Sequence, residues 1–494
     1  MRKKNSAVAA EAVMGENKKK ILFVGAEVMP FAATGGLGDV LGSLPTSLAE
    51  SGEVDVRVVM PLHATVSSLW RKQMKQEYVS TVRLSWREQY CGVYSLVKDG
   101  VTYYFIDNEY YFNRPALYGQ YDDGERYAFF CMAVMEMMRE LDYFPDVLHA
   151  HDWQAALSVV YLNCLYRSRA GYGDIRTVFT IHNIEYQGQY DFAILGDVFA
   201  LGENEHTLME YSGGINLMKA AIECADRVTT VSPRYAEEIR TREYAHGLDS
   251  ALNRNAGKLR GILNGIDYAY YNPSKDKSIA AGFSWRSMAG KAEDKAALQR
   301  ETGLPERADV PVLAIISRLA AHKGVDILAE CIGEIVAQND VQLVILGKGE
   351  ARYEYFFTDL QARYPDRVRA LITYDRDLSK RIYAATDIFL MPSRSEPCGL
   401  AQMIASRYGA IPVVRETGGL YDSIKPYWED NGKLMGNGFT FAGYNAEELF
   451  ERTVAAVDLW NDPTRRDKLV SKIMRTDFSW AEAAQKYMQM YEAL

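Results

Sequence analysis

Cysteine is scarce in this sequence, and long apolar runs are missing from it. The six cysteines among 494 residues stand far apart and none forms a C-x-x-C pair, so their spacing indicates no metal cluster. Scattered cysteines in a long chain instead predict buried thiols in a reducing cytosol. No window of about 18 uncharged apolar residues occurs, so we expect no membrane span.

An excess of basic residues is also missing. The chain has 56 Lys and Arg against 65 Asp and Glu, which gives a net charge of −9. A dedicated nucleic-acid binder is usually basic, so we expect no nucleic-acid partner. An acidic average still permits a local basic pocket for an anionic ligand. With 48% hydrophobic and 24% charged residues, the composition is that of a globular protein with a sizeable core.

The N-terminal segment does not have the pattern of a secretion signal. It begins with a basic head, but its apolar part is short and is interrupted by Glu11 and Glu16. We predict a disordered tail over residues 1–18, with a short organelle-targeting peptide as the alternative. The expected location is the bacterial cytoplasm, with a plastid as the alternative.

The rest of the chain alternates between buried strands and helices in two successive blocks. Strands are predicted at 18–28, 54–61, 101–108, 146–152, 176–183 and 227–232, and then at 310–318, 341–347, 367–374, 387–393 and 411–415. Helical patterns include 126–141, 214–225, 324–339 and 478–494. Strand runs that are apolar on both faces, alternating with helices, predict parallel sheets covered by helices.

This alternation predicts two α/β domains separated by the turn-rich segment 264–278. The domains are expected at 19–265 and 266–477, after the tail at 1–18. The helix at 478–494 is expected to pack back on the N-terminal domain.

Two glycine-rich turns have similar sequences, TGGLGDV from Thr34 and TGGLYDS from Thr417. Glycine lets backbone N–H groups approach an anion, and a helix N-terminus favours phosphate. The first turn is placed at a strand-to-helix connection. TGGLG matches no dinucleotide or P-loop spacing, so a tight connection without a ligand remains the alternative.

Polar side chains stand at strand ends, where α/β proteins build their sites. HAHDW (149–153) and FTIHN (179–183) contribute Asp152 and His182 as candidate binding groups. The alternatives are a structural histidine and an Asp152 that only caps the following helix.

The second domain adds charged groups at its own strand ends. In SRLAAHKG (317–324), Arg318 and Lys323 suit a pyrophosphate, which Arg binds in a fork and Lys as a point charge. In SRSEPCGL (393–400), the Glu396 carboxylate can accept hydrogen bonds from sugar hydroxyls, and Gly399 is expected to open a helix. A solvated loop and ordinary helix capping are the alternatives.

The motifs PFAATGGLGDVLGSLP, HAHDW, FTIHNIEYQG, ILNGIDYAYYNP, SRLAAHKG, MPSRSEPCGL and VRETGGLYD, in this order, resemble bacterial glycogen synthase and plant starch synthase. The resemblance covers residues 19–494. It implies a GT-B fold, two Rossmann-like domains with the active site in the cleft between them. It also implies that glucose passes from ADP-glucose to the non-reducing end of an α-1,4-glucan, with retention and without a metal. No cofactor is expected, since ADP-glucose is a substrate.

The resemblance also implies residue roles. In the N-terminal domain, Thr34, Gly35 and Gly36 form the first glycine turn with Asp39 near the nucleotide-sugar, and Asp152, His182 and Asn183 lie beside the donor glucose. Asn264, of the hinge motif, faces the cleft. In the C-terminal domain, Arg318 and Lys323 bind the distal phosphates, Tyr374 stacks on adenine and Glu396 contacts the donor sugar. Cys398, Gly399 and Leu400 line the same loop as Glu396, and Thr417, Gly418 and Gly419 form the second glycine turn.

One departure concerns position 33, where the family usually has the lysine of KTGGL and this chain has Ala33. That lysine normally approaches the donor phosphates. The loss of one such contact is expected to cost about 1.5–3 kcal/mol, which weakens transfer without abolishing it. Two alternatives therefore stay open: a retaining GT-B transferase with UDP-glucose or another acceptor, and a glucan-binding homologue weakened by Ala33.

Overall fold

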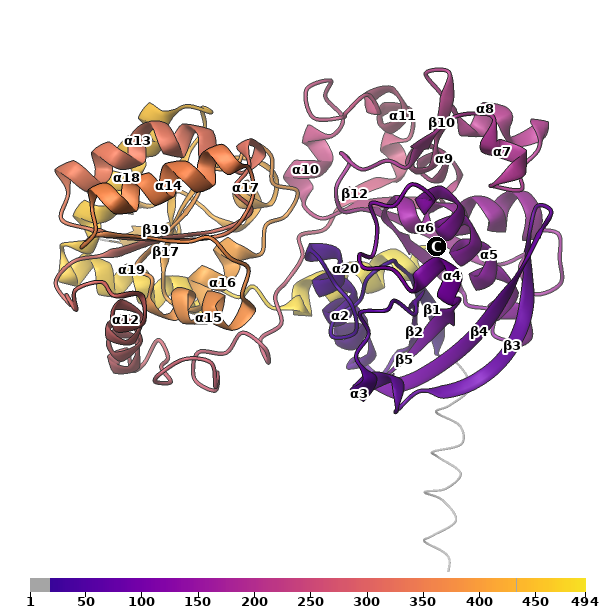
Figure 1. Ribbon diagram of the computed structural model, residues 1–494, viewed down its shortest axis with the longest axis horizontal. Helices are drawn as coiled ribbons and strands as arrows, with labels where there is room; N and C mark the ends of the chain where they lie inside the picture. Colours follow the sequence, from indigo (N-terminus) through magenta and orange to yellow (C-terminus); the bar gives the residue numbers. More distant parts are fainter. Residues whose placement is uncertain (1–17, 432) are drawn as a thin grey trace, which may run out of the picture. The chain divides into compact units, whose positions relative to one another are not determined.

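The computed structural model describes residues 18–431 and 433–494, so residues 1–17 of the predicted tail lie outside the described chain (Figure 1). The chain divides into two compact units. Unit 1 contains the described residues up to Val231, Ala236–Ile262 and Trp480–Leu494, and unit 2 contains Ser232–Tyr235 and Leu263–Ser479.

Unit 1 is built on a mixed sheet. Among the described residues its nine strands are ordered β12-β11-β7-β6-β1-β2-β5-β4-β3. They are β1 (Lys19–Val24), β2 (Val54–Pro61), β3 (Lys75–Leu84), β4 (Arg87–Lys98), β5 (Val101–Asp107), β6 (Val147–His151), β7 (Arg176–Ile181), β11 (Arg227–Thr230) and β12 (Leu259–Gly261). All neighbours are parallel except β3–β4 and β4–β5. A small antiparallel sheet joins β8 (Gln189–Tyr190), β10 (Gly214–Asn216) and β9 (Glu210–Tyr211).

Helices pack on this sheet. Helix α2 (Gly36–Ala49) packs on α20 (Trp480–Glu492), and α5 (Asp123–Glu140), α6 (Asp152–Tyr161) and α9 (Leu217–Cys224) form a second group (Figure 1). The shorter helices are α3 (Ser68–Arg71), α4 (Glu109–Phe112), α7 (Ile194–Asp197), α8 (His206–Met209), α10 (Pro233–Glu238) and α11 (Asp249–Arg254), with the turns η1 (Leu162–Tyr166), η2 (Glu203–Glu205) and η3 (Ala256–Lys258). Of these, α10 spans the divide between the two units.

Unit 2 contains, within its described residues, a six-stranded parallel sheet in the order β15-β14-β13-β16-β17-β20. The strands are β13 (Val312–Ile316), β14 (Gln342–Leu346), β15 (Val368–Leu371), β16 (Ile388–Met391), β17 (Ile411–Arg415) and β20 (Phe439–Phe441), with a separate hairpin of β18 (Trp428–Asp430) and β19 (Lys433–Met435). Helices α13 (Val325–Gln338), α14 (Ala351–Arg363) and α18 (Ala446–Trp460) lie on one face, and α12 (Ala289–Thr302), α15 (Arg376–Ala385), α16 (Ala401–Arg407) and α19 (Pro463–Arg475) on the other (Figure 1). The elements η4 (Ala321–Lys323) and α17 (Gly418–Ser423) follow β13 and β17.

Each unit has its own core, and the last helix belongs to the first one. Trp480, Tyr487 and Tyr491 of α20 are buried in the apolar cluster that surrounds β1 and β2. The Tyr491 hydroxyl lies 2.7 Å from His149 Nδ1 on β6, so a polar contact as well as apolar burial fixes α20 on unit 1.

The predicted strands coincide with observed ones, but one helix prediction was too long. Residues 214–216 of the predicted helix 214–225 form β10, because Ile215 pairs with Tyr190 and Glu210. The helix begins after Asn216, whose side chain caps it by accepting from Lys219 N–H at 2.9 Å. The hairpin β3–β4 and the small antiparallel sheet were not predicted.

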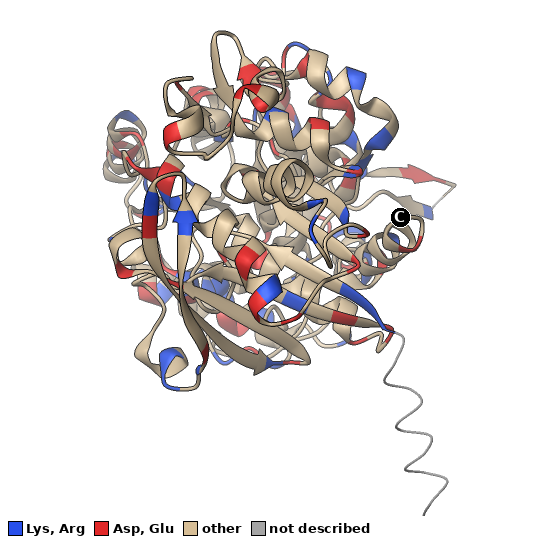
Figure 2. Ribbon diagram, turned by 90° about the vertical axis from the view of Figure 1, so that its right-hand side faces the viewer, with Lys and Arg blue, Asp and Glu red and all other residues tan. Residues whose placement is uncertain are grey.

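No helix among the described residues is long and apolar enough to cross a bilayer. Lys and Arg are interspersed with Asp and Glu in the view of Figure 2.

Candidate functional site

In unit 1, the strand order changes direction between β1 and β6. The chain runs from β1 to β2 on one side and from β6 to β7 on the other. Loops that leave the carboxyl ends of two such strands diverge and form the usual ligand position of an α/β sheet. Here these segments are residues 25–35, which precede α2, and the β6–α6 junction at His151 and Asp152.

The first glycine turn is held by a carboxylate that the sequence motifs did not reveal. Buried Glu27 accepts hydrogen bonds from the backbone N–H of Thr34, from the Thr34 hydroxyl at 3.1 Å and from Gly35 N–H at 3.3 Å. The Tyr118 hydroxyl donates to its other oxygen at 3.2 Å. A Cβ placed on Gly35 or Gly36 would meet no atom within 4 Å, so this turn faces open space.

Asp152 is the first residue of α6 and does not cap that helix. Its Oδ1 accepts from the backbone N–H of His182 at 2.7 Å and of Asn183 at 3.4 Å, at the end of the neighbouring strand β7. Its φ of 56° is left-handed, a conformation that costs free energy for a residue other than glycine. Burial, against the two hydrogen bonds and with a smaller contribution from the charge of Glu27, raises the pKa of the Asp152 carboxyl to about 7.

His182 belongs to a buried histidine pair. Its Nε2 lies 2.9 Å from Nδ1 of His151. Burial lowers the pKa of His182 to about 3 and that of His151 well below its usual value. Both imidazoles are therefore neutral at physiological pH, and each can act as a hydrogen-bond donor or acceptor without a charge.

Two further predicted residues flank this edge of unit 1. Asp39 lies in the first turn of α2, just after the glycine turn. Asn183 is half-buried directly after β7, and its side-chain oxygen accepts from Glu185 N–H at 3.0 Å. The predicted unit 1 residues therefore gather at the carboxyl ends of β1, β6 and β7.

In unit 2, the strand order changes direction between β13 and β16. The loop after β13 carries Arg318 and Lys323, and the loop after β16 carries Glu396. Lys323 Nζ lies 2.8 Å and 3.0 Å from the two oxygens of the Glu396 carboxylate, and the Ser393 hydroxyl donates to that carboxylate at 2.9 Å. The side chains of Glu396 and Lys323 are 8% and 20% exposed, so a largely buried ion pair joins the two loops.

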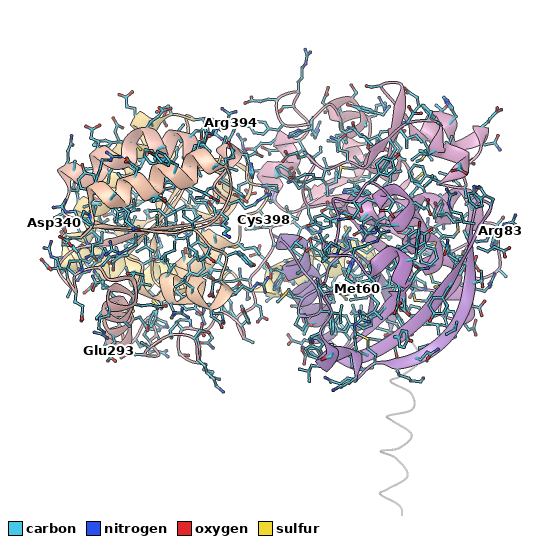
Figure 3. The ribbon with its side chains drawn as sticks, viewed as in Figure 1. Met60, Arg83, Glu293, Asp340, Arg394 and Cys398 are labelled. Carbon is cyan, nitrogen blue, oxygen red and sulfur yellow. The ribbon has the colours of Figure 1, made fainter. Side chains whose placement is uncertain are left out.

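Arg318 is exposed, and its guanidinium forms no ion pair with the described residues. Arg394 and Arg415 belong to the same edge, because Arg394 N–H donates to the His322 carbonyl at 3.0 Å and Arg415 donates to the Arg394 carbonyl at 2.7 Å. Neither was singled out from the sequence, although both stand in motifs that follow a strand. This edge therefore carries several cations, and it is opposite the end of unit 2 that holds Asp340, as the labels Arg394, Cys398 and Asp340 show in Figure 3.

The second glycine turn differs physically from the first. A Cβ on Gly418 would come within 2.0 Å of the Glu396 carbonyl, and one on Gly419 within 2.0 Å of the Cys398 carbonyl. Gly419 N–H donates to the Glu396 carbonyl at 3.1 Å. These glycines let the loops after β16 and β17 touch, so packing requires them whether or not a ligand binds there.

The remaining predicted residues of unit 2 lie around these loops. Cys398 is buried, which raises the pKa of its thiol to about 12, and it receives a hydrogen bond from the backbone N–H of Asn264. The Asn264 side-chain oxygen is buried without a partner among the described residues. Gly399 has a φ of 70° and Leu400 precedes α16, which begins at Ala401 rather than at Gly399. Thr417 is the N-cap of α17, and Tyr374 is 76% exposed after β15.

One cavity of unit 2 lies away from these edges. A cavity of about 640 Å³ between α12 and α19 is lined by Asp387 and Gly409, which precede β16 and β17. It therefore opens at the amino ends of the strands, away from Glu396. Within residues 18–431 and 433–494, no three His, Cys, Asp or Glu side chains are grouped as metal ligands.

Comparison with known proteins gives matches to both units. Residues 20–254 match the family described as starch synthase catalytic domain, and residues 299–471 match glycosyl transferases group 1. The chain is 46% identical over 477 residues to the glycogen synthase of Geobacillus thermodenitrificans, covering 96% of this chain and 98% of that one. It is 45% identical to the glycogen synthase of Ligilactobacillus salivarius, covering 96% and 100%.

Solved structures agree with these matches. The catalytic domain of starch synthase IV from Arabidopsis thaliana, bound to ADP and acarbose, superposes with a TM-score of 0.89 at 33% identity, covering 96% of this chain and 99% of that one. Sucrose-phosphate synthase from Thermosynechococcus elongatus shares the fold, with a TM-score of 0.60 at 17% identity and the same coverage.

Proposed function

This chain belongs to the family of bacterial glycogen synthases and plant starch synthases, glycosyltransferases of GT-B fold that elongate a glucan, and we propose that its donor is ADP-glucose. Glucose passes to the non-reducing end of an α-1,4-glucan with retention, and ADP is released. The observation that carries the proposal is the set of charges at the β13–β16 edge, where exposed Arg318 lies on the same loop as Lys323, which pairs with Glu396.

The two cations act on the leaving group. A diphosphate that departs from glucose gains negative charge, and preorganised donors aimed at that charge lower the barrier. Arg318 is available for this because its guanidinium is exposed and unpaired among the described residues. Lys323 is fixed by the Glu396 carboxylate, which the Ser393 hydroxyl holds in turn, so it meets the phosphate without losing further side-chain entropy.

Glu396 orients the donor sugar. One oxygen accepts from Lys323 alone and the other from both Lys323 and Ser393, and a carboxylate can accept further hydrogen bonds from glucose hydroxyls. We assign it no covalent role. The acceptor hydroxyl attacks from the face that the leaving group departs from, and a phosphate oxygen takes the proton of that hydroxyl.

The unit 1 residues are proposed to contact the glucose of the donor. Neutral His182 and His151 supply hydrogen bonds without adding a positive charge. Asp152 fixes the turn after β7 through the N–H groups of His182 and Asn183. The open space beside Gly35 and Gly36 leaves room for a substrate at that turn.

No resident metal or cofactor is part of the proposal, because Arg318 and Lys323 supply positive charge at the diphosphate. Transfer is expected to continue in excess chelator. Loss of activity in EDTA that Mg²⁺ or Mn²⁺ restores would contradict this assignment. The proposed location is a bacterial cytoplasm, which the bacterial sources of the similar glycogen synthases support.

The test compares nucleotide release from ADP-glucose and UDP-glucose, each with and without glycogen. The proposal expects ADP release that depends on glycogen and a much lower kcat/KM for UDP-glucose. A preference for UDP-glucose would reassign the donor. Glycogen binding without release of either nucleotide would show a binding protein weakened at Ala33.

A further inference from the structure

Two histidines at the carboxyl edge of the unit 1 sheet form a side-chain pair of which one member is fully buried. His151 is the last residue of β6, and His182 directly follows β7. The Nδ1 atom of His151 lies 2.9 Å from the Nε2 atom of His182. His151 is 0% exposed, whereas His182 is 9% exposed. A ligand can therefore touch His182, and His151 can act on that ligand only through His182.

The ring of His151 is held in place by other rings. Alternate residues of a strand point to the same face of a sheet, so His149 and His151 lie together on β6, with their ring centroids 4.2 Å apart. The ring of Phe23 on β1 lies 5.5 Å from that of His151, at an angle of 20°. His149 is fixed in turn, because each of its nitrogens has a hydroxyl partner, at 2.7 Å and 2.6 Å. These contacts keep the His151 ring turned towards His182.

The surroundings of the pair indicate where its hydrogens lie. Burial lowers the pKa of both imidazoles, so both are neutral and only one of the two facing nitrogens carries a hydrogen. The outer nitrogen of His151, Nε2, is buried without a partner among the described residues, whereas the outer nitrogen of His182, Nδ1, is not buried in this way. A buried N–H group without an acceptor is rare in folded proteins. The hydrogen of His151 is therefore assigned to Nδ1.

From this geometry we propose that His151 is a positioning residue for His182. His151 Nδ1–H donates to His182 Nε2, so the hydrogen of the His182 ring lies on Nδ1, the nitrogen that a ligand can reach. In a neutral imidazole, the hydrogen bond of one nitrogen determines which nitrogen is protonated. His182 then offers a donor, and not an acceptor, to a hydroxyl oxygen of the donor glucose. The role towards glucose rests on the proposed function, whereas the tautomer of His182 does not.

Asp152 complements this contact from the side of the backbone. Its Oδ1 accepts from the backbone N–H of His182 at 2.7 Å, while His151 holds the ring. Two consecutive residues at the β6–α6 junction therefore fix both parts of His182. A donor that is held in place before the substrate binds loses little entropy when it forms its hydrogen bond. Removal of the His151 nitrogen should leave the backbone contact intact and free only the ring.

The first experiment measures the tautomer directly, in the full-length protein without substrate. The chain has seven histidines, so isotope labelling of histidine gives a small number of NMR signals, and nitrogen–proton correlations distinguish Nδ1–H from Nε2–H. The expected result at neutral pH is an Nδ1–H tautomer for His182, whose signal is identified by its loss in His182→Ala. An Nε2–H tautomer, or a rapidly exchanging mixture of the two, would overturn the proposal.

Two variants separate the hydrogen bond of His151 from its packing. His151→Phe keeps an aromatic ring but has no nitrogen, so His182 should lose its fixed tautomer. The kcat/KM for ADP-glucose should then fall about tenfold while the KM for glycogen is unchanged. His151→Asn should retain most of the activity and the tautomer, because its side-chain N–H is as many bonds from Cα as Nδ1 is. Equal losses in both variants would contradict the hydrogen bond. His206→Phe is the matched control, since His206 also stacks on a phenylalanine ring but lies outside the pair.

A double-mutant cycle tests whether His151 acts through His182. In His182→Ala, the added change His151→Phe should alter kcat/KM by less than about twofold, because the group that His151 positions is already absent. Additive losses, or an Nδ1–H tautomer of His182 that persists in His151→Phe, would show that His151 serves packing alone.

Circular dichroism and urea unfolding check that each variant is folded. If His151→Phe does not fold, His151→Asn and the tautomer of the parent protein test the proposal. Absence of nucleotide release by the parent protein would instead contradict the proposed function, and the tautomer of His182 would still show whether His151 positions it.

Discussion

The ammonium of Lys323 lies within 3.0 Å of both oxygens of the Glu396 carboxylate, although 73 residues separate them in the sequence. They meet because β13 and β16 are neighbours in the sheet while the chain reaches β16 only after β14 and β15. Arg318, on the same loop as Lys323, has no such partner among the described residues. Arg318 and Lys323, which the sequence motif presents as equivalent cations, therefore differ in their contribution to the stability of the fold.

The first prediction separates these two cations. Both Arg318→Ala and Lys323→Ala should lower kcat by about 10²-fold, since each removes a donor from the leaving phosphate. Only Lys323→Ala should also lower the free energy of unfolding, by about 2 kcal/mol, because it leaves the buried Glu396 carboxylate without its cation. Steady-state kinetics and urea unfolding measure the two effects. Lys468→Ala on α19 is the control. Normal activity of both Arg318→Ala and Lys323→Ala would show that these residues do not bind the leaving phosphate.

The second prediction concerns the Glu396 carboxylate. Glu396→Gln keeps its size and loses its charge, so kcat should fall by about 10²-fold while the apparent affinity for glycogen changes little. Ser393→Ala removes one hydrogen bond to the Glu396 carboxylate and should lower kcat only several-fold. Kinetics with varied glycogen and varied donor distinguish these outcomes. A defect confined to glycogen binding would show that Glu396 does not belong to the donor site.

The third prediction is a pH dependence of stability that Asp152 causes. Its folded pKa of about 7 lies above the ordinary 3.8, so between these values the folded state holds a proton that the unfolded state has released. Stability from this group is therefore present at about pH 4 and is lost as the pH rises towards about 7, by up to about 4 kcal/mol. Asp152→Asn removes the titration, and asparagine tolerates the left-handed backbone. Its unfolding free energy should fall less steeply over this range than that of the parent.

Urea unfolding at about pH 4.5 and about pH 7 tests the difference between the two proteins. Asp142→Asn is the matched control, because Asp142 also has a positive φ, of 47°, but is exposed. Equal slopes for Asp152→Asn and the parent protein would show that burial does not hold a proton on Asp152.

The fourth prediction contrasts the two glycine turns. A methyl group at Gly36 meets no atom within 4 Å, whereas one at Gly419 meets the Cys398 carbonyl at 2.0 Å. Gly419→Ala should therefore destabilise unit 2 by about 1–3 kcal/mol, and Gly36→Ala should leave the free energy of unfolding within about 0.5 kcal/mol. If Gly36 faces substrate, its variant should still raise the donor KM. Thermal unfolding and kinetics of both variants measure these effects. Equal stability of Gly419→Ala and Gly36→Ala would mean that the close contact at Gly419 relaxes without a cost in free energy.

How far the sequence predicts this molecule depends on the range of the contacts involved. Runs such as 310–318 and 411–415 are apolar on both faces over most of their length and contain β13 and β17. Most residues of strand β3 are exposed or half-buried, and its pairing with β4 has no comparable signal. Lys323 and Glu396 were identified separately, whereas their ion pair depends on the strand order.

One other contact had no local signal at all. Glu27 stands seven residues before the turn that it holds, in a segment that the sequence predicts as the end of a strand. Spacing motifs describe one loop at a time, so a contact between two segments has to come from the fold.

The last prediction concerns position 33. The Cβ of Ala33 packs against Gly38, and the Glu27 carboxylate lies beside the same point, 3.5 Å from where a Cβ on Gly38 would be. A lysine in Ala33→Lys would therefore extend next to the carboxylate that holds Thr34 and Gly35, and an ion pair with Glu27 would fix its ammonium at the glycine turn. If that turn faces the donor phosphates, the donor KM should fall by up to about tenfold, or about 1.4 kcal/mol.

Salt and a second variant test the cause. The gain should shrink as salt screens the added charge, and the donor KM of both forms over a salt series measures this. In Ala33→Lys with Glu27→Gln the lysine loses its anchor, so the gain should be smaller than in Ala33→Lys alone. An unchanged donor KM at low salt, where screening is weakest, would mean that position 33 does not face the donor phosphates in this chain.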